Sequence, residues 1–264
     1  MPASEHPKIK LYWLSQSRSQ RIIWLLEELK VPYELEVFHR DENTLMAPRE
    51  LEKVHALGKS PIISITPTGK DAKPIILAES GFIAQYLLDH TSEGQNLMPK
   101  KWQDGKENTI AGETEDWLRY AYYMHYAEGS LMPYLVFALV ISRLKSPQVP
   151  FLIRPITSII ANRIIGMFLY PNVKKHLSFI NDQLASSTGK YLCGKTLCAA
   201  DILMSFPLIA GDGRFNELGS WKDGSWRSEF PKVWEYVQLL LAEPGYKKSV
   251  AKVEEIDGKF EASL

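Results

Sequence analysis

The stretch from Leu57 to His90 constrains the fold more than any other part of this chain. Residues 62–65 form a short isoleucine-rich run bounded by prolines, which predicts a β-strand. The turn residues PTGKD follow, and a second apolar run, residues 75–77, is long enough to pair back as a hairpin. Apolar residues then recur at helical spacing as far as His90. The stretch therefore predicts a β-hairpin that leads directly into a helix.

The junction between the hairpin and this helix carries Glu79 and Ser80. The first turn of a helix presents backbone N–H groups that have no partner within the helix, and these favour an anion. The Ser80 hydroxyl adds a donor at the same place, and the Glu79 carboxylate is suited to an ammonium group. A site with both features is suited to an amino acid.

The residues before this stretch predict a strand, a helix and a second strand. Polar and apolar residues alternate over residues 9–14, apolar residues recur at helical spacing over 22–29, and residues 33–38 predict the second strand. A short helix is expected at 48–54. The resulting order, β-α-β-α-β-β-α, is typical of a thioredoxin-like domain, which we expect to cover residues 1–92.

After a polar linker the sequence predicts helices only. The helical segments are 117–145, the strongly apolar 156–170, 173–184, the nearly all-apolar 200–210 and 232–241. We therefore expect a second, all-helical domain over residues 106–264. The fold class is α/β plus all-α, with the thioredoxin-like domain first.

Composition argues against several classes of protein. Lys and Arg together number 31, as do Asp and Glu, and this neutral balance argues against nucleic acid as a partner. The first ten residues lack the apolar segment of a signal peptide, and the longest apolar run, residues 131–141, is shorter than the roughly 18 residues of a spanning helix. Cys193 and Cys198 are the only cysteines. We expect a cytoplasmic protein with no disulfide framework and no metal.

Five runs of sequence carry a family resemblance. The runs are SRSQRIIWLLEEL, GKSPII, ILAESGFIAQYL, YAEGSLMPYL and ADILMSFPL. They resemble the cytosolic glutathione transferases, and within them the fungal branch. The resemblance implies that Pro61 is cis, that the Ser60 backbone pairs with the cysteinyl part of glutathione, and that Glu79 and Ser80 take its γ-glutamyl end. Lys59 and Arg40 lie where related transferases contact the cysteinyl–glycine end.

The loop after the first strand is expected to carry the chemistry. No cysteine precedes Cys193, which excludes a mechanism based on a cysteine at the start of the first helix. In the serine-type transferases that the chain resembles, a serine stands four residues ahead of an arginine in the first helix. Ser17 and Arg21 fit that spacing, and Ser15 is the second candidate.

Ser17 also has a purely structural interpretation. With Gln20 it forms the pattern Ser-x-x-Gln, which is typical of a capping box for the helix that follows. The two interpretations are compatible, because a hydroxyl at a helix N-terminus lies where an anion is already favoured. Arg18 is expected to add positive charge beside the glutathione sulfur.

Two features of the helical domain lead to further expectations. Trp117, Tyr123 and Tyr126 are the expected electrophile site, although aromatic residues in a helix more often face the core. The family usually places Ser or Thr three residues before the Asp of its central helix, and here Cys198 precedes Asp201. Because a thiol is a weak hydrogen-bond partner, we expect a half-formed capping box or a cap from Thr196.

Two classes of function remain open. The first is a glutathione S-transferase that conjugates the glutathione thiolate to small hydrophobic electrophiles, with hydroperoxide reduction as a related activity. The second is a non-catalytic glutathione-binding or regulatory protein on the same scaffold. The resemblance also implies a homodimer. The apolar segment 156–170 fits a core helix, a cap over the electrophile site or a patch that contacts membranes.

Overall fold

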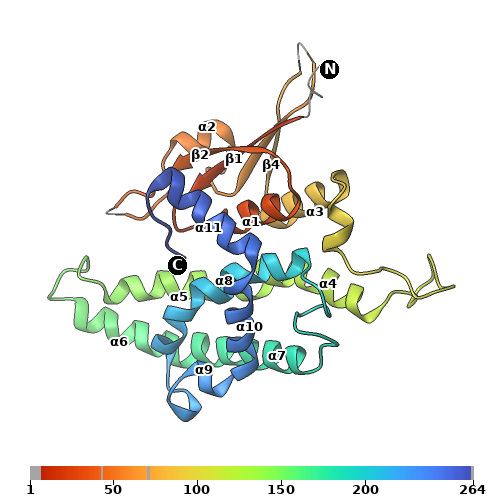
Figure 1. Cartoon of the computed structure of the whole chain (residues 1–264). Coiled ribbons are helices and arrows are strands. Elements are labelled where there is room, and N and C mark those ends of the chain that lie inside the picture. Colours follow the sequence, from red (N-terminus) through yellow and green to blue (C-terminus); the bar gives the residue numbers. More distant parts are fainter. Residues whose placement is uncertain (1–6, 43, 70–71, 263–264) are drawn as a thin grey trace. The chain divides into compact units, whose positions relative to one another are not determined.

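The computed structural model describes residues 7–42, 44–69 and 72–262 (Figure 1). Contacts divide the chain into two compact units. The first extends to Pro99 and also includes Ala242–Ala262, and the second is Lys100–Leu241.

A four-stranded sheet forms the centre of the first unit. Its strands are β1 (Lys8–Leu14), β2 (Tyr33–Phe38), β3 (Ile62–Thr66) and β4 (Ile75–Ala78), in the order β2-β1-β3-β4. Strand β1 is parallel to β2 and antiparallel to β3, and β4 is antiparallel to β3. The helices are α1 (Gln20–Glu28), α2 (Glu50–Val54), α3 (Ser80–His90) and α11 (Pro244–Asp257). The predicted thioredoxin-like arrangement, including the hairpin and its helix, is confirmed.

The C-terminal helix α11 belongs to this first unit, whereas the sequence placed everything after residue 106 in the helical domain. It packs on α1, where the Gln20 Nε2 atom donates to the Ser249 Oγ atom at 2.9 Å. The Trp24 and Tyr246 rings meet edge to face, 5.4 Å between centroids. The residues of the two helices are far apart in sequence, so no local pattern predicted this packing.

The second unit consists of helices, as predicted. They are α4 (Glu115–Tyr126), α5 (Met132–Ser142), α6 (Arg154–Ile164), α7 (Tyr170–Ala185), α8 (Ala199–Phe215), α9 (Trp226–Glu229) and α10 (Pro231–Ala242). The π-helical turn η2 (Ala127–Leu131) joins α4 to α5, and a second one, η4 (Ile165–Leu169), joins α6 to α7. Most of α8 is buried, so it forms the core of the unit, and α4 packs along it.

The N-terminus of α8 corrects the expectation of a half-formed cap. Helix α8 begins directly after Cys198, and the Asp201 carboxylate accepts from both the backbone N–H and the thiol of Cys198, at 2.9 and 3.0 Å. Its other oxygen accepts from the Leu192 N–H at 3.1 Å and from the Tyr236 hydroxyl at 2.6 Å. The thiol therefore takes part as a donor, and Thr196 is not the cap.

One helical run, Glu115–Lys145, is long and apolar enough to cross a membrane by length and composition alone. The run contains α4, η2 and α5, and the sequence analysis did not anticipate it because it considered uninterrupted apolar residues only. Core helices of water-soluble proteins meet the same criterion, and Tyr123, Leu131 and Leu135 of this run are almost completely buried within the protein.

The apolar segment 156–170 is not a core helix. Within it only Ala161, Ile165 and Leu169 are buried, and most of the other large apolar side chains face solvent. The core interpretation of this segment is therefore wrong.

Candidate functional site

The strand registers bring the predicted site residues to one edge of the sheet. Tyr12 of β1 pairs with Ile62 of β3, and Ile62 pairs with Ala78 of β4. Leu14 at the end of β1 pairs with Phe38 at the end of β2. The loop after β1, the loop after β2, the residues before β3 and the residues after β4 therefore all lie at the same edge.

Glu79 and Ser80 stand at the N-terminus of α3, immediately after β4. Glu79 has a backbone φ of 71° and ψ of 113°, outside the region that non-glycine residues prefer. Its side chain is exposed, whereas Ser80 is only 3% exposed and is the first residue of the helix. Such a backbone conformation is strained and persists only where the surrounding structure holds it in place. Residues with strained backbones are concentrated at binding and catalytic sites. The geometry places an exposed carboxylate beside the free N–H groups of α3.

Ser60 and Pro61 lie directly before β3 at the same edge. The Ser60–Pro61 peptide bond is cis, as the resemblance implied. The Ser60 Oγ atom donates to the Tyr12 backbone oxygen at 3.0 Å, so this loop is fastened to β1. Lys59 is exposed.

Ser17 lies in the loop between β1 and α1 and is 7% exposed. Its Oγ atom is 2.6 Å from the Ser19 Oγ atom and also accepts from the Ser19 N–H at 3.2 Å. The predicted capping box with Gln20 does not form, because α1 starts only at Gln20, whose side-chain amide is directed to Ser249. Ser17 is therefore part of a hydroxyl pair ahead of the helix.

Hydrogen bonds between Ser15 and Arg40 connect the loop after β1 to the loop after β2. The Ser15 Oγ atom accepts from the Arg40 N–H, and the Ser15 backbone oxygen accepts from Arg40 Nε, both at 3.2 Å. The other guanidinium nitrogens donate to the backbone oxygens of Leu45 and Gln16, at 2.9 and 3.3 Å. Burial and the nearby positive charge of Arg18 lower the pKa of Arg40 from its ordinary value. Arg40 thus has a clear structural role, and it carries a second positive charge close to that of Arg18.

A cavity of about 250 Å³ adjoins these two loops. The last residue of α11 and the chain after it provide one wall. There the Gln16 Nε2 atom donates to a Glu261 carboxylate oxygen at 2.7 Å, and His39 Nε2 lies 3.0 Å from Asp257 Oδ1. Sequence reasoning missed this wall because it assigned the C-terminal residues to the other domain. The lining residues are Trp13, Ser15, Gln16, His39, Arg40, Glu42, Leu45, Asp257, Lys259 and Glu261.

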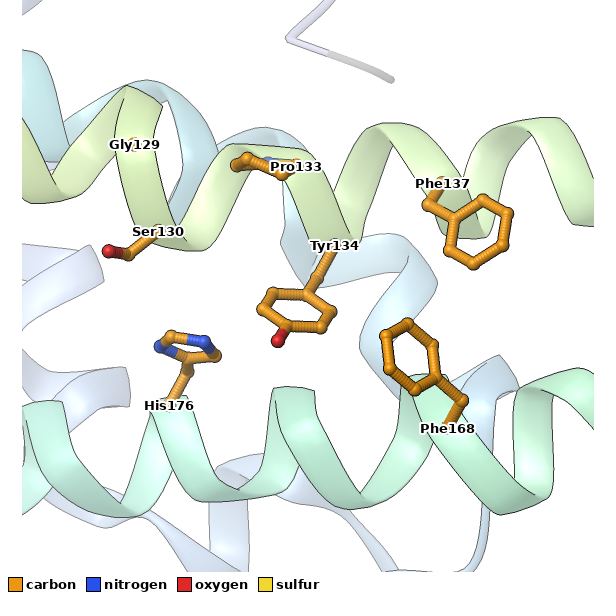
Figure 2. Close-up of a pocket in the computed structure, with 7 residues that line it drawn as sticks. All are labelled: Gly129, Ser130, Pro133, Tyr134, Phe137, Phe168 and His176. Atoms are coloured by element: carbon orange, nitrogen blue, oxygen red, sulfur yellow. The ribbon is translucent and has the colours of Figure 1, made fainter.

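The helical unit has a larger cavity of its own, about 600 Å³ in volume (Figure 2). The Tyr134 and Phe137 rings of α5 lie on one side of it, and the Phe168 ring of η4 and the imidazole of His176 of α7 lie on the other. The Phe137 and Phe168 rings lie 6.0 Å apart, and the Tyr134 and His176 rings 5.0 Å apart. The lining residues are Gly129, Ser130, Pro133, Tyr134, Phe137, Phe168 and His176.

The three aromatic residues predicted for the electrophile site do not line this cavity. Tyr123 and Tyr126 are 1% and 4% exposed, and burial raises the pKa of both hydroxyls. Tyr126 reaches the cavity only through His176, whose Nδ1 atom lies 2.5 Å from its hydroxyl oxygen. Trp117 is half-buried and packs on Tyr120. Tyr134 and Phe137 of the cavity lie eight and eleven residues after Tyr126, beyond the π-helical turn η2, and Phe168 comes from η4.

Metal-ligating side chains do not gather in the part of the chain that the structure describes, where no three or more His, Cys, Asp or Glu residues form a group that could hold an ion. Both cysteines are buried, and burial raises the pKa of the Cys198 thiol.

Comparison with known proteins gives consistent matches. Residues 17–90 match the family model for the N-terminal domain of glutathione S-transferase. The chain is 33% identical over 255 residues to glutathione S-transferase 1 of Saccharomyces cerevisiae, which covers 96% of this chain and 99% of that protein. It is 30% identical over 247 residues to glutathione S-transferase 3 of Schizosaccharomyces pombe, covering 94% and 88%.

Solved structures agree with these relatives. A glutathione S-transferase from Actinobacillus pleuropneumoniae superposes with a TM-score of 0.66 at 26% identity, over 96% of this chain and 95% of that one. A glutathione transferase homologue from Lodderomyces elongisporus, solved with two glutathione molecules per subunit, has a TM-score of 0.62 at 21% identity, over 92% and 97%. Elongation factor 1-gamma 1 of Oryza sativa is 26% identical over 216 residues, but these cover 79% of this chain and only 40% of that protein.

Proposed function

Because this chain belongs to the glutathione S-transferase family, we propose that it is an enzyme that conjugates the thiolate of glutathione to small hydrophobic electrophiles. The observation that carries the proposal is the meeting of Ser17, Ser60 and Glu79 at one edge of the sheet, which the strand registers require. Glu79 holds a strained backbone conformation there, which fits a binding role.

The residues at this edge have complementary tasks toward glutathione. The Glu79 carboxylate accepts from the ammonium of the γ-glutamyl group, while Ser80 and the first N–H groups of α3 donate to its carboxylate. The Ser60 backbone pairs with the cysteinyl residue. Arg18, Arg40 and Lys59 supply positive charge for the glycine carboxylate.

Ser17 acts on the sulfur as a hydrogen-bond donor. A thiol with a pKa near 8.5 is only a few per cent ionised at pH 7, and lowering the pKa by two units makes roughly three quarters of it thiolate. The Ser17 hydroxyl, the N-terminus of α1 and the Arg18 charge all favour the thiolate. The proton leaves to solvent. The sulfur electron pair then forms the new bond to the electrophilic carbon, while a leaving group such as chloride departs with its bonding electrons or, in an addition, the π electrons of the acceptor move away and take up a proton from solvent. Hydroperoxide reduction by the same thiolate is a related activity.

The cavity of the helical unit is the proposed pocket for the electrophile. Its volume of about 600 Å³ is within the usual range for small-molecule sites, and its walls are mostly apolar and aromatic. We therefore propose that the electrophile contacts Tyr134, Phe137, Phe168 and His176. Tyr126 packs against His176, and Tyr123 packs against Tyr126.

We also propose that the protein is a cytoplasmic homodimer. In the family that the chain resembles, the two subunits meet through the third helix and the long fourth helix, which here means residues 84–89 of α3 and part of 107–126. Large apolar side chains are exposed within these segments or next to them. Phe82 of α3 is 53% exposed, and Leu118 and Tyr122 of α4 are 54% and 49% exposed. Light scattering at micromolar concentration is expected to give twice the mass of one chain.

The experiment that tests the proposed function measures binding and turnover separately. Calorimetry with glutathione reports binding, and the absorbance of the conjugate formed from a chlorodinitrobenzene reports turnover. Binding with turnover above the uncatalysed rate supports the proposal. Binding without turnover toward a panel of electrophiles supports the second candidate, a non-catalytic scaffold protein, which the similarity to elongation factor 1-gamma favours. No binding would refute both.

A further inference from the structure

The solvent side of α6, of the turn before it and of η4 after it carries seven large apolar side chains, which we call the α6 face. Each of these side chains is between 49% and 75% exposed. The residues of the α6 face are Phe151, Leu152, Ile153, Ile156, Ile159, Ile160 and Met167.

The side chains of the α6 face follow the period of the helix. Ile159 and Ile160 lie three and four positions after Ile156, so these three residues share one side of α6. The buried residues Ala161 and Ile165 belong to the opposite side. A helix at the surface of a water-soluble protein normally turns polar side chains outward, so this helix has an unusual second apolar side.

Helix α6 lies at the periphery of its unit. Its main contacts are with α5, with the short helix η3 (Arg143–Lys145) and with η4, which continues it (Figure 1). The neighbouring helix extends the apolar surface, since Val140 and Phe137 of α5 are 55% and 38% exposed. A continuous exposed surface with this many large apolar side chains usually marks a site that binds a partner protein, a ligand or a membrane.

The charged residues of the chain segment that contains the α6 face have one sign. Residues 129–181 contain six Lys and Arg residues and no Asp or Glu, in a chain whose acidic and basic residues are equal in number. Lys174 pairs with Glu229, whereas Arg143, Lys145, Arg154 and Arg163 have no carboxylate partner among the residues that the structure describes. Arg163 lies seven positions after Ile156 and is itself exposed, in line with the apolar stripe.

We propose that the α6 face docks on the surface of an anionic lipid bilayer. Exposed isoleucine, leucine and phenylalanine side chains enter the boundary between headgroups and acyl chains, and the surrounding basic side chains attract anionic headgroups. A second copy of the chain is a poorer occupant, because a two-fold contact would place the same uncompensated positive charges opposite each other. The face is separate from the proposed glutathione site, so docking does not depend on the proposed activity.

Vesicle sedimentation with the full-length protein tests the proposal. One set of vesicles is phosphatidylcholine alone, and the other contains phosphatidylserine at about a third of the lipid. We expect the protein to sediment with the anionic vesicles, less with the neutral ones, and less with either in high salt, because salt screens the headgroup attraction. If the amount of protein in the supernatant is the same with and without anionic vesicles, the proposal is overturned.

A pair of matched double variants assigns the binding to the α6 face. Ile156→Gln with Ile159→Gln removes two exposed isoleucines of the face, and Ile110→Gln with Ile256→Gln removes two exposed isoleucines elsewhere. We expect the first variant to bind anionic vesicles at least about tenfold more weakly and the second to bind like the parent. Equal binding by both variants would contradict the assignment. Vesicle-independent self-association that only the first variant loses would show instead that the face joins two copies.

Discussion

The Oγ atoms of Ser17 and Ser19 lie 2.6 Å apart, and Ser19 in turn is anchored to the last residue of β1. Its Oγ atom is 3.3 Å from both the backbone oxygen and the backbone nitrogen of Leu14. The hydroxyl proton of Ser19 has two possible acceptors, the Leu14 oxygen and the Ser17 Oγ atom. When Ser19 donates to Ser17, the Ser17 proton is free to point at a thiolate.

Replacing Ser17 tests whether this hydroxyl activates the thiol. Ser17→Ala is expected to leave glutathione affinity nearly unchanged and to lower turnover ten- to a hundredfold at pH 6.5, since less of the bound thiol is ionised. Much of the loss should be recovered at pH 9, where the thiol ionises without help. Steady-state rates across this pH range provide the measurement.

Ser15→Ala is the control for Ser17→Ala. Ser15 accepts from the Arg40 backbone, and we expect this variant to change turnover little. If Ser15→Ala has the larger effect, Ser15 is the activating residue. If neither variant matters, backbone N–H groups or another donor stabilise the thiolate.

Replacing Ser80 tests the binding site at the start of α3. Ser80→Ala removes one hydrogen bond to a charged group, worth roughly 1.5–3 kcal/mol, so glutathione affinity should fall at least about tenfold. Titration calorimetry gives the affinity, and Ser64→Ala, at a serine inside strand β3, is the control that should leave it unchanged. An unaltered affinity in Ser80→Ala would remove this residue from the site.

Local patterns predicted the fold around the candidate glutathione site, but they did not predict the cavity of the helical unit. The secondary structure of the segment Leu57 to His90 could be predicted because its hairpin, its turn and the start of its helix are all specified by residues close together in sequence. The aromatic residues that line the cavity of the helical unit were not predicted, because the π-helical turn η2 interrupts the helix between Tyr126 and Tyr134. Such a turn has more than 3.6 residues, so a face counted along α4 is not the face presented by α5.

The C-terminal helix was assigned to the wrong unit for a different reason. Its amphipathic pattern shows that one side of α11 is buried, but not which element covers that side. The contact between Trp24 and Tyr246 joins residues from opposite ends of the chain. Local patterns also could not predict the cavity wall at Glu261, because a hydrogen bond to Gln16, from the other end of the chain, holds this residue at the sheet edge.

Gly245 of α11 lies directly against the Trp24 and Glu28 side chains of α1. A Cβ atom there would be 2.8 Å from Trp24 Nε1 and would displace the Glu28 carboxylate, which accepts from that nitrogen. Because Trp24 is fully buried, Gly245→Ala should lower the free energy of unfolding by about 1–3 kcal/mol. Urea denaturation measures this value. Gly213→Ala, in α8 with no neighbouring atom within 4 Å of the new Cβ, should be neutral or slightly stabilising.

His176 is expected to make the helical unit sensitive to acid. Burial and the neighbouring Lys175 lower the pKa of His176 from 6.5. As the pH falls below 6.5, the unfolded chain binds a proton on this residue that the folded protein binds only at lower pH. Protonation therefore favours the unfolded state, and the free energy of unfolding should fall through this pH window. In His176→Gln, urea unfolding curves between pH 7.5 and 5 should show a weaker dependence on pH. An unchanged dependence would mean that other groups cause the acid sensitivity and that the half-buried imidazole beside Tyr126 titrates as it does in water.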